Sequence, residues 1–84
     1  MKATQKMLDA VMDELGIDEI DPAWVDGILY EYRRMRTATA RKELRAAAKE
    51  FEASGGRGVE LAEEVDALRV LLAARKAAKK SKKR

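Results

Sequence analysis

The chain has 84 residues, with 18 Lys and Arg against 15 Asp and Glu, and it contains neither Cys nor His. Without these two residue types it has no disulfide, no thiolate or imidazole metal ligand and no His-based nucleophile pair. We therefore expect neither an enzyme nor a metal site, cofactor or small-molecule substrate. The length suits one all-α domain with a thin core.

The first predicted element is a helix over residues 4–15. The Thr4 hydroxyl can cap the free amides of its first turn, and Gly16 can take the left-handed conformation that ends a helix. Apolar side chains at helical spacing form one packing face: Met7, Leu8, Val11, Met12 and Leu15. The apolar runs are too short for a signal peptide or a membrane span, so we expect a cytoplasmic protein.

The dipeptide Asp21-Pro22 predicts the start of a second helix. Asp21 suits the N-cap, and Pro22 suits the first helical position because it has no amide hydrogen to leave unsatisfied. Ile20 and Val25 have the spacing of a hydrophobic staple across this start.

Nothing in the sequence stops this second helix before Ser54, so we predict one long helix over residues 22–54. The N-terminal helix is expected to pack on its first half. The alternative is a bend or break near Thr37 to Thr39, where β-branched side chains lower the helix propensity.

The Gly-rich segment from Ser54 to Gly58 predicts a chain reversal, and the third helix is expected over residues 59–80. The second and third helices then form an antiparallel hairpin. The third helix has a coiled-coil-like seam at Leu61, Val65, Leu68 and Leu72. A second apolar face, at Ala67, Val70, Leu71 and Ala74, must be covered by the first helix or by another chain.

Charge is segregated along the chain. Residues 1–28 have a balance of −5, residues 29–54 of +3 and residues 55–84 of +5, and residues 75–84 contain seven bases and no acid. We expect a helical domain over residues 1–78 and a basic tail over residues 79–84. In the hairpin, residue k should lie beside residue 112 − k, which brings Lys76 near Arg36 and Lys79 near Arg33. A polyanion would neutralise these converging charges.

The first functional hypothesis is a non-enzymatic protein that associates with the backbone of DNA or RNA. Phosphate contacts are expected from the bases of the central helix and of the C-terminal segment: Arg33, Arg34, Arg36, Arg41, Lys42, Arg45, Lys49, Arg75, Lys76, Lys79, Lys80, Lys82, Lys83 and Arg84.

The second hypothesis is a protein-interaction module: a homodimer, or a small subunit or inhibitor in a larger assembly such as a phage particle. Its basic tail would then bind an acidic protein or only aid solubility. The predicted interface is the spare apolar surface at Trp24, Ile28, Met35, Val70 and Leu71. A membrane is not an expected partner, because Ala77 and Ala78 are the only apolar residues in the tail.

Overall fold

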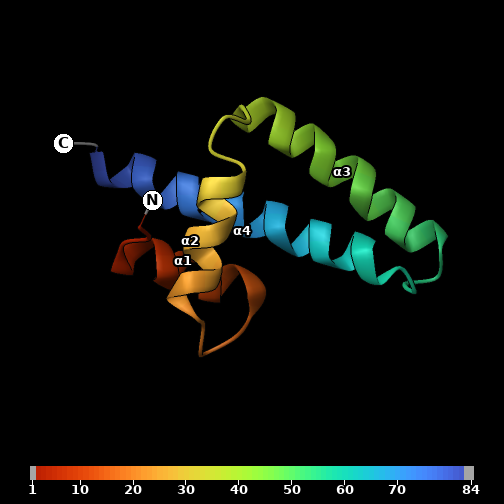
Figure 1. The fold of residues 1–84 in the computed structure, drawn as a ribbon, viewed down its shortest axis with the longest axis horizontal. Coiled ribbons are helices and arrows are strands. Elements are labelled where there is room, and N and C mark those ends of the chain that lie inside the picture. The colour runs from red at the N-terminus through yellow and green to blue at the C-terminus, as the bar shows by residue number, and fades with distance from the viewer. Residues whose placement is uncertain (1, 83–84) are drawn as a thin grey trace.

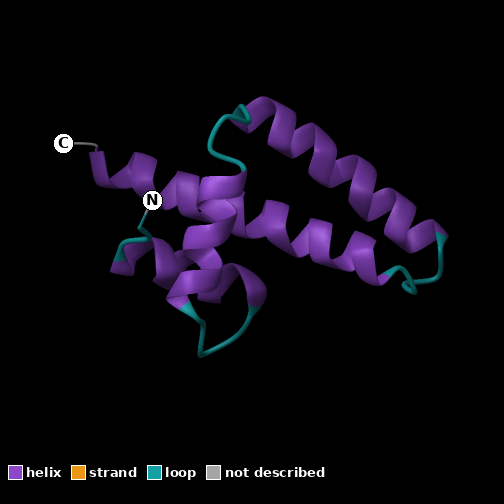
Figure 2. Ribbon diagram, viewed as in Figure 1, coloured by secondary structure: helices purple, strands orange, loops and turns teal. Residues whose placement is uncertain are grey.

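The computed structural model describes residues 2–82, with side chains described through Lys79. This part of the chain folds into four helices and contains no strand (Figures 1 and 2). The helices are α1 (Gln5–Leu15), α2 (Pro22–Glu31), α3 (Thr37–Ala53) and α4 (Val59–Lys82). The predicted all-α class is confirmed, whereas the predicted number of three helices is wrong. None of these helices combines the length and apolar character needed to cross a membrane.

The predicted boundaries of α1 and the start of α2 are confirmed. The Thr4 hydroxyl accepts a hydrogen bond from the Met7 amide at 3.2 Å. Gly16 ends α1 with a φ of 68°, in the left-handed region that favours glycine. A carboxylate oxygen of Asp21 accepts a hydrogen bond from the Ala23 amide at 3.0 Å, and Pro22 occupies the first turn of α2.

The single long helix predicted over residues 22–54 is wrong. The alternative, a break near Thr37, is the one that the structure shows, because the chain leaves the helix after Glu31 and a new helix begins at Thr37. At the turn, Arg33 Nη1 donates to the Tyr30 carbonyl at 2.8 Å and Arg75 Nη2 donates to the Tyr32 carbonyl at 3.0 Å. Each carbonyl also accepts a backbone amide of the turn, Tyr30 from Arg33 and Tyr32 from Met35, so the two guanidinium groups add further hydrogen bonds to them.

The break lets all three shorter helices use α4 as their common support. Both α1 and α3 pack along α4, and α2 contacts it over a shorter stretch. The expected packing of the N-terminal helix on the first half of the long helix is therefore wrong, because its main partner is α4. Close to α1, the Ala3 amide donates to an Asp26 carboxylate oxygen of α2 at 2.6 Å.

The core lies where α1 and α2 meet the second half of α4. Val70 and Leu71 are 0% exposed and Ile28 is 5% exposed, and they belong to one cluster with Leu8 and Val11 of α1. The predicted interface at Ile28, Val70 and Leu71 is therefore wrong. Of the two alternatives for this face of α4, coverage within the chain is the one the structure shows.

The predicted antiparallel hairpin is formed by α3 and α4, which lie side by side in Figure 1. Gly55 and Gly56 reverse the chain with φ values of 78° and 74°, which only glycine adopts at low cost. Arg75 Nη1 donates to Thr37 Oγ1 at 3.3 Å, and this is the pair that the predicted register gives for residue 75.

Candidate nucleic-acid interface

A hollow of about 580 Å³ lies between α3 and α4, and we call it the basic groove. Five bases line it, together with the apolar side chains of the hairpin and a single acid, Glu14. The five bases are Arg41, Arg69, Arg75, Lys76 and Lys79. The hairpin thus gathers positive charges from residues far apart in the sequence.

Two of these bases are held by hydrogen bonds. Arg69 Nε lies 3.2 Å from a Glu14 carboxylate oxygen, and its Nη2 donates to the Glu14 carbonyl at 2.8 Å. Arg75 donates to the Tyr32 carbonyl and to Thr37 Oγ1. Because two donors fix each guanidinium, these two charges are positioned before any ligand arrives.

The other three bases, Arg41, Lys76 and Lys79, are exposed. Among residues 2–79, whose side chains the structure describes, the pair between Arg69 and Glu14 is the single ion pair. The three exposed bases therefore have no ion-pair partner among these residues and are accessible to an anionic ligand.

The positive surface continues along α3. Arg45 and Lys49 follow Arg41 at intervals of four residues, which places them on one line of the helix over about 12 Å. Lys42 lies on the adjacent line, and all of these side chains are exposed. This line extends the basic groove toward the Gly-rich turn.

Other predicted phosphate-binding residues lie outside the basic groove. Arg33 is turned onto the Tyr30 ring, with its guanidinium carbon 4.0 Å from the ring centroid. Arg34 and Arg36 are exposed in the turn between α2 and α3, and neither lines the groove. The side chains of Lys80 and Lys82, and all of Lys83 and Arg84, lie outside the described residues.

Arg69 is a groove residue that our sequence reasoning missed. A signal was present, because Arg69 lies seven residues before Lys76 and therefore on the same face of α4. The residue that Arg69 contacts, Glu14, is 55 residues away in the sequence, and no local pattern predicts that contact.

A second hollow of about 720 Å³ lies between α2 and the first turns of α4, and we call it the acidic cleft. It shares no lining residue with the basic groove. Trp24, which was predicted at an interface, lines the cleft with 42% of its surface exposed. Five carboxylates line it and no base does: Glu31, Glu60, Glu63, Glu64 and Asp66.

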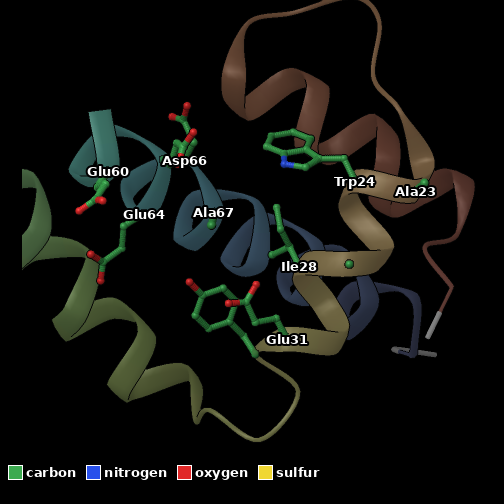
Figure 3. Close-up of a pocket in the computed structure, with 11 residues that line it drawn as sticks. Ala23, Trp24, Ile28, Glu31, Glu60, Glu64, Asp66 and Ala67 are labelled. Carbon is green, nitrogen blue, oxygen red and sulfur yellow. The ribbon is translucent and has the colours of Figure 1, made fainter. Parts of the chain in front are cut away.

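Figure 3 shows how the acidic cleft is built. Trp24 and Glu31 of α2, and Glu60, Glu64 and Asp66 of α4, surround one open space. No group of three or more carboxylates in the described part of the chain is placed to hold a metal ion. The cleft thus presents dispersed negative charge beside an aromatic ring.

Tyr32 also lines the acidic cleft, and its hydroxyl is sensitive to the negative charges nearby. Burial raises the pKa of its hydroxyl above the usual value of 10.0, and the nearby carboxylates of Glu31, Glu64 and Glu43 raise it further. Each of these carboxylates disfavours the phenolate.

Met35, another predicted interface residue, is half-buried and packs against the core.

The molecule therefore carries two oppositely charged hollows, one on each flank of the α4 helix. The basic groove is suited to phosphate, and the acidic cleft is suited to a cation. Comparison of the chain with protein-family models, with curated proteins and with solved structures finds no match.

Proposed function

We propose that the protein binds the phosphate backbone of nucleic acid in the basic groove. The observation that carries this proposal is the convergence of Arg41, Lys76 and Lys79 on one hollow, each exposed and without an ion-pair partner among the described residues. Like charges that share one hollow repel one another, and a bound anion relieves that repulsion. A polyanion does so and releases its own counterions, which drives binding.

Recognition in the basic groove is directed to the backbone and not to the bases. Sequence-specific recognition uses hydrogen bonds to base edges or stacking on aromatic side chains. Trp24, Tyr30 and Tyr32 do not line the groove, and two of its three arginines, Arg69 and Arg75, are already hydrogen-bonded within the protein. We therefore expect similar affinities for different sequences.

The salt dependence of binding tests this proposal. Fluorescence anisotropy with a short labelled duplex should show a steep loss of affinity between about 50 and 200 mM NaCl. Contacts from Arg41, Arg45, Lys49, Lys76 and Lys79 predict a slope of roughly −4.5 in a plot of log K against log salt for duplex DNA. Duplex DNA, duplex RNA and single-stranded DNA serve as parallel probes.

Single substitutions locate the site. Arg41→Ala or Lys76→Ala should weaken binding to all sequences by a similar factor and reduce the slope by about 1. Arg57→Ala is the matched control, because Arg57 is an exposed base in the turn at the far end of the hairpin and does not line the groove. Absence of binding to all three probes at low salt would refute the proposal. Equal losses for Arg57→Ala and Lys76→Ala would refute the assigned site.

A further inference from the structure

The acidic cleft has two features that recognise a cationic side chain. Its five carboxylates attract positive charge, and the partly exposed Trp24 ring offers a face on which an ammonium or guanidinium group can stack. No base of the described residues lines the cleft, so its charge is not compensated there. Its volume of about 720 Å³ leaves room for several side chains.

The chain itself contains a segment of the matching chemistry. Residues 76–84 carry six bases and no acid. The helix α4 continues through Lys82, so most of this segment extends the rigid helix on which the basic groove is built. Its Lys residues alternate with small Ala and Ser residues, so no bulky side chain blocks its approach to a cleft.

A single copy cannot place this segment in its own cleft. Lys79 and Glu64 lie fifteen residues apart on one continuous helix, which separates them by about 22 Å. The cleft carboxylates of α4 lie in its first two turns, and the basic segment is its far end. A basic segment that fills the cleft must therefore come from another molecule.

We propose that the acidic cleft binds the basic C-terminal segment, residues 76–84, of a second copy of this chain. The Lys side chains pair with the cleft carboxylates, and Trp24 packs over one of the bound cations or its aliphatic stem. Because the surfaces are charged and accessible, the association is sensitive to salt. The proposal does not rest on nucleic-acid binding, and its test contains no nucleic acid.

Sedimentation equilibrium of the full chain measures this association. At low ionic strength the average mass should rise with protein concentration from the 9.4 kDa of one chain to at least twice that value. At high ionic strength it should return to one chain. A mass that stays at one chain at every concentration and low salt would overturn the proposal.

Substitutions in the cleft test the surface. The triple variant Glu31→Gln, Glu63→Gln and Glu64→Gln removes three cleft charges and leaves every groove residue in place, so it should stay monomeric. The matched control is Asp18→Asn, Glu19→Gln and Glu52→Gln, which removes three exposed charges outside the cleft and should still associate. Trp24→Ala should weaken association without a change in charge.

Mixing two variants tests whether the segment that enters the cleft is the basic C-terminal segment. A variant with Lys79, Lys80, Lys82 and Lys83 replaced by Ala retains an intact cleft but lacks most of the basic segment. This variant and the cleft variant should each be monomeric alone, and their mixture should form a complex, since one supplies the cleft and the other the segment. Circular dichroism shows whether each variant keeps its helices. A folded cleft variant that still associates, or a mixture that does not, would overturn the assigned contact.

Discussion

The basic groove and the acidic cleft are both built on α4, yet they carry opposite charges. The first two turns of α4 supply Glu60, Glu63 and Glu64 to the cleft, and its last turns supply Lys76 and Lys79 to the groove. This order matches the helix dipole, so the separation of charge also favours the helix. The net charge of +3 therefore conceals two local fields of opposite sign.

The two hollows also differ in how firmly their charges are held. In the basic groove, hydrogen bonds fix the guanidinium groups of Arg69 and Arg75. In the acidic cleft, no carboxylate makes a side-chain hydrogen bond or ion pair with another described residue. The groove is therefore partly organised before binding, whereas the cleft carboxylates can reorient around a cation.

The largest expected effect is on stability, and it comes from placing a charge in the core. Leu71 is 0% exposed, so Leu71→Asp places a charge where it has no partner. We expect a loss of at least about 3 kcal/mol in the free energy of unfolding, comparable with the whole stability of a domain this small. Thermal unfolding followed by circular dichroism measures it.

The matched control is Val59→Asp, at a position that is 70% exposed at the start of α4. A carboxylate there agrees with the helix dipole, so the stability should be unchanged or slightly higher. A folded Leu71→Asp variant that only changes its mass in solution would instead make Leu71 an interface residue.

Arg75 tests whether the turn between α2 and α3 depends on a side chain of α4. Arg75→Ala removes the hydrogen bonds to the Tyr32 carbonyl and to Thr37 Oγ1, and the Tyr32 carbonyl keeps the Met35 amide, so the free energy of unfolding should fall by about 1–2 kcal/mol. Arg75→Lys keeps the charge but loses the two-pronged geometry. Its free energy of unfolding should therefore fall by most of the amount expected for Arg75→Ala, whereas nucleic-acid binding should be largely retained. Urea denaturation and anisotropy measure the two effects, and equal stability of all three proteins would contradict this role.

Local signals were sufficient to predict the caps, the chain reversal and the helical register. Thr4, Gly16 and Asp21 each act within a few residues of themselves, so the sequence around them predicts their structure. The antiparallel register follows from the short turn alone, and the Arg75–Thr37 contact agrees with it.

The break after Glu31 and the coverage of α4 were not predictable in the same way. The break is stabilised by Arg75, which lies 43 residues beyond the Tyr32 carbonyl that it contacts. Val70 and Leu71 looked like a spare surface because the pattern of α4 does not show that α1 and α2 cover it. Four of the five groove bases were predicted by their charge and Arg69 was not, whereas the cleft required knowledge of how α2 crosses α4.

Glu14 is the one acid of the basic groove, and replacing it should make the groove more positive relative to the acidic cleft. Glu14→Gln frees the Arg69 charge for phosphate, so nucleic-acid binding should tighten and its salt slope should steepen by up to about 1. Because the pair is largely exposed, the stability should change by less than about 1 kcal/mol. Asp18→Asn is the control, because Asp18 is an exposed acid that does not line the groove. Weaker binding by Glu14→Gln would contradict the assignment.

The smallest expected effect is on the titration of Tyr32. Its pKa is raised in the folded state by burial and by Glu31, Glu64 and Glu43. Stability from this group is therefore fully present below the unfolded pKa near 10.0, and it is lost as the pH rises through the folded pKa. In a Tyr30→Phe background, which leaves Tyr32 as the only tyrosine, Glu31→Gln should lower the pKa measured by ultraviolet absorbance. An unchanged pKa would show that the Glu31 charge does not act on the Tyr32 hydroxyl.

The most direct test of nucleic-acid binding in the basic groove is a titration of the ¹⁵N-labelled protein with duplex DNA, followed by amide chemical shifts. We predict that the shifts concentrate at Arg41, Arg45, Lys76 and Lys79 and fade as salt is raised. Shifts centred on the acidic cleft, or no shifts at low salt, would contradict it.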